Sequence, residues 1–431
     1  MSDALGRRTR AKVARRIIPF VFLLYIFNFL DRINVGYAKL EMNADLGFSE
    51  TIYALGAGVF FVGYVIFEIP SNLILQRVGA RVWIARIMIT WGIIATAMAL
   101  VDGAVTFYVL RFLLGFAEAG FFPGIILYLT YWFTAAERAR AVTGFVTALA
   151  AASIFGSLVS AVFLGMEGLL GLEGWQWLFI LEGVPTVLIG IGVLFYLTDR
   201  PEKARWLEPE ERAWLANRLE SEREQKIRAR DYRLRDIFIT PKVLALSLTY
   251  FCLVTGFYGI TLWLPSIIQS FSGLDNVKTS LVSAIPYVAA GIAMVVIGRH
   301  SDRTGERKWH VAGPLLLAAA GFVLSTVLEN PVLEIAALCL ATIGIFSALG
   351  PFWTLPTAFL TGSAAAGGLA LINSIGNIGG FVSPMIVGHI KDATGDYGYG
   401  LLALAGFLIV GALIAVLLPH DRRLEAPEGA E

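Results

Sequence analysis

Four ionisable residues lie inside stretches that are otherwise apolar and long enough to cross a membrane. Asp31 and Arg32 are adjacent in YIFNFLDRINVGYA, and Arg111 and Glu118 are seven residues apart in YVLRFLLGFAEAGFFPG. A charge at the centre of a bilayer costs roughly 3 kcal/mol or more on insertion scales, so such residues usually mark a substrate or ion pathway. Arginine binds carboxylates through a fixed pair of N–H donors, and a carboxyl group removed from water resists ionisation. Together these types predict a site where arginine holds an anion and acidic groups carry protons.

The spacing of these residues along their helices predicts that they meet. With a rise of about 1.5 Å per residue, Asp31 lies roughly 13 Å, and Arg111 about 10 Å, from the outer end of its helix. Glu118 falls on the same face as Arg111, roughly 20 Å deep and near the membrane midplane. We expect all four residues to form one inward-facing cluster. The alternative is a static ion-pair network that fastens helices together.

The composition is that of an integral membrane protein. Of the 431 residues, 57% are hydrophobic and 16% are charged, and the mean hydropathy is +0.71. Soluble chains of this length are much less apolar. The formal net charge of +1 argues against a nucleic-acid partner. Cys252 and Cys339 lie in apolar stretches and are expected to be small buried hydrophobic residues, so we predict no disulfide, metal or cofactor.

Twelve apolar segments of about 20 residues predict an all-α membrane protein with twelve transmembrane helices. They cover residues 17–40, 51–75, 82–101, 104–130, 141–165, 176–198, 243–270, 279–298, 311–328, 332–356, 366–388 and 400–419. We expect two pseudo-symmetric six-helix bundles, 17–198 and 243–419, with a basic N-terminal segment (1–16) and a C-terminal tail (420–431). The segment 199–242 carries twelve Lys/Arg and ten Asp/Glu, so it is expected to be a solvated linker. An amphipathic helix at the membrane surface, anchored by apolar residues of this linker, is the alternative. Those residues are Trp206, Leu207, Trp214 and Leu215.

The distribution of basic residues predicts the orientation in the membrane. With a cytoplasmic N-terminus, the inner segments hold 29 of the 34 Lys/Arg residues. The others are Arg32, Arg111, Lys39, Lys278 and Lys391, of which the three lysines fall in outer loops. Because cytoplasmic loops are enriched in positive charge, both termini and the linker are expected in the cytoplasm. The location would be the inner (plasma) membrane.

An internal repeat relates the two halves. SNLILQRVGARVW (71–83) follows the second segment, and GRHSDRTGERKW (298–309) follows the eighth. Their alignment pairs Gln76 with Asp302, Arg77 with Arg303, Gly79 with Gly305, and Arg81 with Arg307. Glycine permits the tight turn, and the charged residues could form a conformational latch at the helix ends. The first copy lacks the acid of the second, and the alternative is ordinary positive charge in cytoplasmic loops.

Both loops resemble the signature G-x-x-x-D-R-x-G-R-[KR] of the major facilitator superfamily, in which two six-helix halves rock about a central site. Further motifs resemble its anion:cation symporter family: FLDRINVGYA, GYVIFEIPSNLIL, RFLLGFAEAGFFPGIILYLTYWF, ERARAV, WQWLFILEGVPT and ALINSIGNIGGFVSP. Bacterial tartrate-type and sugar-acid permeases look most similar. The resemblance implies transport of organic anions, commonly with protons. It implies substrate binding by Arg32, Arg111 and Tyr64, and proton carriage by Asp31 and Glu118.

The second half offers neutral polar candidates within its membrane segments. Asn373 and Asn377 are four residues apart, so they share one helix face and could reach substrate hydroxyls. The alternative is that they join helices. The polar candidates of this half are Asn373, Ser374 and Asn377, together with the aromatic residues Tyr250, Tyr258, Trp263 and Trp353, of which Tyr258 and Trp353 are the weaker. We therefore expect charge in the first half to bind the anion and the second half to select it.

Two further carboxyl groups lie near helix ends, Glu68 in FEIPSN and Glu182 in FILEGVP. Both are expected to be structural, and to cap helices or pair with loop arginines such as Arg138 and Arg140.

Other function classes fit less well. An enzyme would need a nucleophile, metal or base cluster, a channel a repeated filter, and a sensor an added signalling domain. We expect no enzyme but a monomeric secondary transporter of an organic carboxylate, a tartrate-like hydroxy-dicarboxylate or sugar acid, by proton symport with alternating access. Exchange or facilitated diffusion of an aromatic or other organic acid stays open, as does a membrane-embedded substrate sensor.

Overall fold

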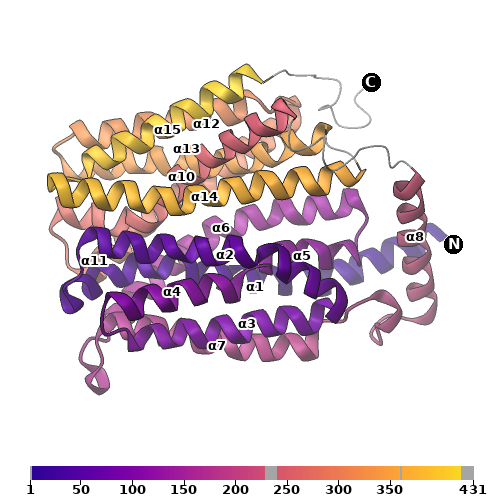
Figure 1. Ribbon diagram of the computed structural model, residues 1–431. Helices are drawn as coiled ribbons and strands as arrows, with labels where there is room; N and C mark the ends of the chain where they lie inside the picture. The colour runs from indigo at the N-terminus through magenta and orange to yellow at the C-terminus, as the bar shows by residue number, and fades with distance from the viewer. Residues whose placement is uncertain (1, 229–239, 360–361, 419–431) are drawn as a thin grey trace.

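The computed structural model describes residues 2–228, 240–359 and 362–418. Within these ranges every regular element is a helix, and twelve helices are long and apolar enough to cross a membrane. Each of the twelve predicted segments coincides with one of these spans (Figure 1). The predicted fold class is therefore confirmed.

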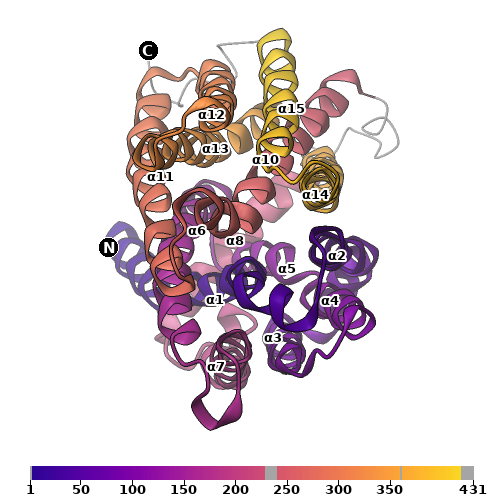
Figure 2. The same cartoon turned by 90° about the vertical axis from the view of Figure 1, so that its left-hand side faces the viewer.

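The first half consists of α1 to α7, which lie together in Figures 1 and 2. Their bounds are α1 Ser2–Leu46, α2 Glu50–Val78, α3 Ala80–Ala97, α4 Ala104–Glu118, α5 Phe121–Thr130, α6 Ala135–Leu164 and α7 Gly174–Tyr196. Helices α4 and α5 together make one membrane span, 104–130. The basic segment expected before the first membrane helix is the start of α1 itself, because α1 is continuous from Ser2.

The second half consists of α10 to α15. Their bounds are α10 Pro241–Ser272, α11 Asn276–Thr304, α12 Trp309–Val327, α13 Pro331–Phe359, α14 Gly362–Thr394 and α15 Gly398–Leu417. The halves meet where α2 packs along α14, α6 along α11, and α1 against α10. Figure 2, which looks along the helices, shows these pairs between the two groups. A site formed by α1, α2 and α10 would thus lie between the halves.

The fourth membrane span is broken directly after Glu118. Helix α4 ends at Glu118, and α5 begins after Gly120, whose φ of 85° lies in the left-handed region that glycine adopts readily. A Cβ atom on Gly120 would collide with the side chain of Ser71 on α2. The break therefore places Glu118 at a helix end and lets α2 pass close to the turn.

The repeated loops turn as the sequence predicts. Gly79 follows α2 with φ of 100°, and Gly305 follows α11 with φ of 65°. Both values belong to the left-handed region, where a side chain would be strained. The glycine pairing of the internal repeat is therefore matched by backbone geometry.

Helix α8 (Pro209–Arg228) lies across one end of the first half, beside the start of α1 (Figure 1). Leu207 and Leu215 are buried, and Trp206 stacks on Trp132 with ring centroids 5.4 Å apart. Leu207, Leu215 and Trp206 therefore pack on protein rather than serve as a lipid anchor. We call this end of the molecule the α8 end and the other the opposite end.

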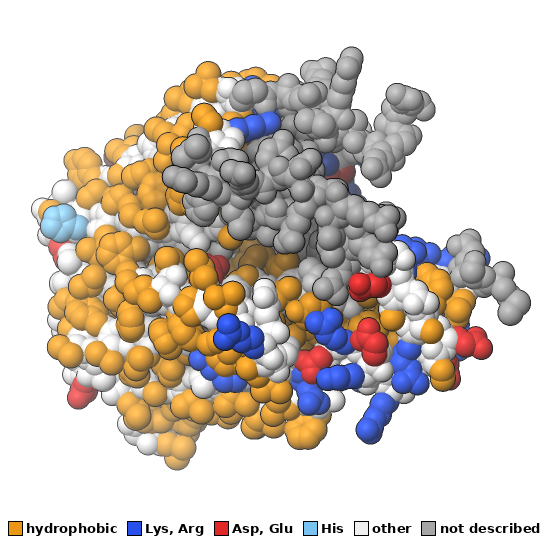
Figure 3. Space-filling model, turned by 45° about the vertical axis from the view of Figure 1, so that its right-hand side comes forward, with side chains coloured by type: hydrophobic (Ala, Val, Ile, Leu, Met, Phe, Trp, Pro, Cys, Tyr) orange, Lys and Arg blue, Asp and Glu red, His pale blue; other side chains and the backbone are white. Residues whose placement is uncertain are grey.

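The outer surface is suited to lipid. Ile69, Phe195 and Leu417 expose 65%, 83% and 80% of their surface, respectively. Figure 3 shows apolar side chains over most of the visible flank, whereas Lys, Arg, Asp and Glu gather at the α8 end. This division is expected of a protein that spans a membrane and meets water at its ends.

Candidate functional site

Arg32 and Glu118 form an ion pair between α1 and α4. The Arg32 Nε donates to Glu118 Oε1 at 2.5 Å, and Asn28 Nδ2 donates to the same oxygen at 2.7 Å. Glu118 is completely buried. A buried carboxylate with a charged donor and a neutral donor is well stabilised, so an anion that engages Arg32 must compete with Glu118.

Arg32 also joins the two halves. Its Nη1 donates to the Tyr258 hydroxyl on α10 at 3.2 Å, and its guanidinium carbon lies 4.9 Å from the centre of the Tyr64 ring on α2. Two predicted substrate contacts, one from each half, therefore lie beside Arg32.

Arg111 is fixed by the backbone of α2. Its Nε and Nη2 donate to the carbonyl oxygens of Gly56 and Ala57 at 3.2 and 3.3 Å, and the residue is 1% exposed. The Phe60 ring lies 4.9 Å from its guanidinium carbon and 5.7 Å from that of Arg32. The two arginines thus share one aromatic neighbour, and both lie inside the first half near its contact with the second.

Each arginine keeps one buried nitrogen without a hydrogen-bond partner among the described residues. These atoms are Arg32 Nη2 and Arg111 Nη1, and the second carboxylate oxygen of Glu118 is likewise unpartnered. Buried polar groups are nearly always satisfied, and an unsatisfied charged donor is costly. Two such donors are therefore the strongest sign of a place for an anion.

Asp31 does not belong to this cluster, which corrects the expectation of a single group of four charges. Its Oδ2 accepts from Trp91 Nε1 on α3 at 2.5 Å and from Thr186 Oγ1 on α7 at 3.2 Å. Consecutive helical residues point about 100° apart, so Asp31 and Arg32 face different neighbours. The sequence predicted how deep these residues lie along their helices, but not the direction in which each side chain points around the axis of α1.

Glu182 pairs with a neighbour that the sequence did not suggest. It accepts from Asn34 Nδ2 at 2.9 Å, and the same nitrogen lies 3.5 Å from Asp31 Oδ1. The side chains of Arg138 and Arg140 lie outside the described residues. Glu182 is therefore an acidic neighbour of Asp31, and only the packing of α1 on α7 could have shown this.

In the second half, Asn373 reaches across to the first. Its Nδ2 donates to Glu68 Oε1 on α2 at 2.9 Å, and Ser374 also interacts with Glu68. Asn377 is buried. Glu68 is thus a contact between the halves, which corrects its expected pairing with loop arginines. While Glu68 accepts from Nδ2, Asn373 offers a substrate its second N–H and its amide oxygen.

The aromatic candidates differ in position. Tyr250 stacks on Phe352 with centroids 4.9 Å apart, and it also packs edge-on against Trp353. Trp263 lies elsewhere, 5.1 Å from the Tyr53 ring. Of these aromatic candidates, Tyr258 lies nearest the anion site, since its hydroxyl accepts a hydrogen bond from Arg32.

The predicted latch residues make their described contacts within each half. Arg307 pairs with Asp302 at 2.7 Å, whereas Gln76, Arg77 and Arg303 are exposed. In the first half the Arg81 backbone donates to Asp199 Oδ1 at 2.9 Å. Asp199, which follows α7, therefore supplies a carboxylate near the place where the first loop has Gln76. An alignment of the two loop sequences could not identify Asp199, because this residue lies outside both loops.

A lysine that the sequence assigned to an outer loop joins the halves at the opposite end. Lys39 Nζ on α1 donates to Ser266 Oγ at 2.9 Å and to the Tyr397 hydroxyl at 3.0 Å, and lies 2.8 Å from Glu50 Oε2. The Trp263 ring is 4.7 Å from the ammonium. We call Lys39, Glu50, Ser266, Trp263 and Tyr397 the Lys39 cage.

A second contact closes the same end. Asp392 on α14 accepts from the backbone N–H groups of Glu50 and Thr51 at the start of α2, at 3.1 and 2.7 Å. A carboxylate at a helix N-terminus is stabilised by the free N–H groups and the helix dipole. The two halves are therefore held together at the opposite end.

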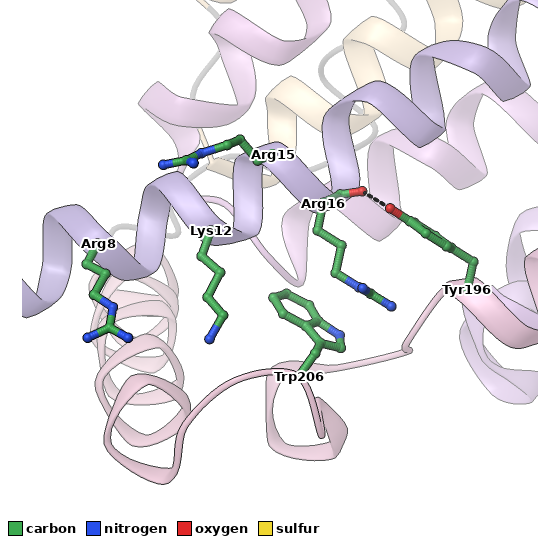
Figure 4. A pocket seen from close by; sticks show the side chains of 6 residues that line it. All are labelled: Arg8, Lys12, Arg15, Arg16, Tyr196 and Trp206. Carbon is green, nitrogen blue, oxygen red and sulfur yellow. Dashed lines mark hydrogen bonds between the residues drawn. The ribbon is translucent and has the colours of Figure 1, made fainter.

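A basic pocket at the α8 end is distinct from the candidate site. Its volume is about 510 Å³, and it is lined by Arg8, Lys12, Arg15, Arg16, Tyr196 and Trp206 (Figure 4). Arg16 lies 15 residues before Asp31, a distance of roughly 22 Å along α1. Among the described residues, no group of three or more His, Cys, Asp or Glu side chains could hold a metal ion.

Comparison with known proteins agrees with the fold. The sequence model of the Major Facilitator Superfamily matches residues 21–384, and the chain belongs to this superfamily. It is 50% identical to a protein of Agrobacterium vitis named "Putative tartrate transporter", over 99% of this chain and 98% of that one. It is 39% identical to the inner membrane transport protein RhmT of Escherichia coli K12, over 98% of each chain. The crystal structure of a D-xylose–proton symporter has a TM-score of 0.75 at 14% identity and covers 96% of this chain and 99% of that one.

Proposed function

We propose that this protein transports an organic carboxylate of the tartrate type across the bacterial inner membrane by proton symport with alternating access. The two unpartnered arginine nitrogens in the buried site, Arg32 Nη2 and Arg111 Nη1, carry this proposal. An arginine pair suits a dicarboxylate because each guanidinium offers N–H donors in a fixed plane. The Agrobacterium relative at 50% identity supports the tartrate class.

The Arg32–Glu118 pair supplies a route from anion binding to proton binding. A carboxylate bound to Arg32 competes for the donor that Glu118 now accepts at 2.5 Å. Once that donor turns to the substrate, Glu118 is a buried acid with less positive charge beside it, and the neutral form is favoured. Binding of the anion and of a proton at Glu118 therefore assist each other.

Alternating access follows from the contacts between the halves. The Lys39 cage and Asp392 close the opposite end, which the distribution of Lys and Arg assigns to the outside. Rocking of the halves that opens this end would break these contacts and reorient the central contact of Arg32 with Tyr258. The cytoplasmic position of both termini and the monomeric state are part of this proposal.

Transport into liposomes tests the proposal. Purified protein is reconstituted, and uptake of radiolabelled tartrate is followed with and without an imposed pH gradient. We expect uptake driven by an acidic outside, lost in Glu118→Gln and retained in Glu334→Gln, which changes a carboxyl group in the first turn of α13. Tartrate uptake that is the same with and without the pH gradient would favour exchange or facilitated diffusion. Failure of tartrate, together with uptake of an aromatic or other acid from a panel, would refute the substrate class.

A further inference from the structure

Two carboxyl groups lie together on the side of α1 that faces α7. Asp31 and Glu182 are 1% and 4% exposed, and both are near Asn34, one helical turn after Asp31. Arg32, by contrast, faces Glu118 and α10. The acidic pair is therefore separate from the place proposed for the anion.

The acidic pair and Asn34 have more hydrogen-bond acceptors than donors. Asp31 accepts from Trp91 and Thr186, whereas Glu182 accepts only from Asn34 Nδ2, which also faces Asp31. Glu182 Oε1 and Asn34 Oδ1 have no partner among the described residues. One additional proton on the pair would supply a donor where donors are missing.

Charge leads to the same conclusion. In the described part of the chain, no lysine or arginine forms an ion pair with Asp31 or Glu182. Two negative charges side by side in a membrane-buried site, without a cation, are strongly unfavourable, so one of the two acids stays neutral. If Glu182 served only to accept the hydrogen bond from Asn34, an uncharged glutamine at this position could accept it as well.

We propose that Asp31 and Glu182 form a proton-binding site of their own, in which the two carboxyl groups on either side of the Asn34 amide hold one proton between them. Binding converts one carboxylate to a carboxylic acid, and release returns the proton to water. That this site binds a proton does not depend on the proposed function. That the proton takes part in transport does rest on the proposed function.

Groups on the neighbouring helices couple this site to the anion site. Glu118 on α4 acts electrostatically on Asp31, and Tyr37 on α1 lies near Glu182 with its hydroxyl bonded to Ser157 of α6. The described neighbours from α3 and α7 that bond Asp31, Trp91 and Thr186, are neutral. A change at Glu118 is therefore felt by the acidic pair, and the reverse also holds.

Infrared difference spectroscopy of the purified protein tests the site without any substrate. We expect a carboxylic-acid C=O band at neutral pH that shifts in D₂O and disappears in Glu182→Gln and in Asp31→Asn. Thr186→Val, which removes one hydrogen bond to Asp31, should shift the band without abolishing it, and this milder variant guards against misfolding. Glu334→Gln is the matched carboxyl control. A spectrum that Glu182→Gln and Thr186→Val leave unchanged would overturn the proposal.

A proton titration separates this site from the proposed function. Raising the pH from neutral should release about one proton fewer per chain from purified Glu182→Gln than from the unmodified protein, because only the intact pair carries a proton at neutral pH. Equal release from both proteins would overturn the inference. Failure of tartrate to bind the unmodified protein would instead refute the proposed function, and leave the spectroscopic result standing.

Discussion

Replacement of Lys39 by methionine should open the protein at the end opposite α8. Methionine keeps the length and apolar packing of the side chain but removes the ammonium. The variant loses three contacts to the second half: the hydrogen bonds to Ser266 and Tyr397 and the cation–π contact with Trp263. Glu50 stays on the same half as Lys39, so its ion pair does not depend on closure.

The magnitude follows from these contacts. A hydrogen bond from a charged donor contributes about 1.5–3 kcal/mol, and a cation–π contact in a desolvated site about 2 kcal/mol. Hydration of the free ammonium in the open state cancels part of this sum. We expect a net change of about 2–3 kcal/mol, which raises the ratio of open to closed protein roughly 30- to 150-fold.

Distances between spin labels measure this change. Asp102 and Glu329 are exposed at the opposite end, one in each half, and carry the labels after replacement by cysteine, with Cys252 and Cys339 removed. Lys39→Met should populate a longer distance. Lys278→Met is the matched control, because Lys278 pairs with Asp275 of its own half at 2.8 Å. Distance distributions that do not differ among these proteins would refute the role of the Lys39 cage.

Three further predictions concern the site, the α8 contact and the packing of α2 on α4. Arg32→Lys removes the planar donor set and should weaken tartrate binding about 10- to 100-fold in calorimetry; unchanged affinity would contradict the anion site. Burial opposes ionisation of Glu211, but hydrogen bonds from Lys12 and the Glu208 amide outweigh it and lower the pKa of Glu211. The docking of α8 should therefore be fully stable above the usual pKa of glutamate, about 4.3, and weaken as pH falls through the lower folded value; Glu211→Gln should abolish this dependence in hydrogen exchange of α8. Gly115→Ala places a Cβ against the Phe60 carbonyl oxygen and should lower the free energy of unfolding by about 1–3 kcal/mol, whereas Gly192→Ala, with nothing nearby, should leave the melting temperature unchanged or slightly raised.

The membrane spans and their division into halves could be predicted because hydrophobic length alone determines them. The pairing of Arg32 with Glu118 was also within reach, since two opposite charges deep in neighbouring helices are strongly favoured to meet. The partners of Asp31 were not, because the rotation of α1 about its own axis decides whether a side chain faces α4 or α7. The boundaries of a helix in sequence do not give that angle.

Contacts that depend on the conformational state were equally out of reach. Lys39 lies at the end of the first apolar segment, close to Glu41 and Asp45, and its sequence surroundings resemble those of an ordinary solvated lysine. Its burial results from the meeting of α1 with α10 and α15, which exists only when that end is closed. Glu68 and Asn373 are 305 positions apart, and only the packing of α2 on α14 brings them together.

The contact of Asp199 with Arg81 determines where this chain could be divided into two separately expressed polypeptides. The acid that the first loop lacks lies after α7, and α8 is bound to the start of α1 through Glu211. A cut directly after the sixth membrane span would separate both groups from the bundle they stabilise. A cut beyond Arg228 would keep them with it, so the linker up to the end of α8 is structurally part of the first half.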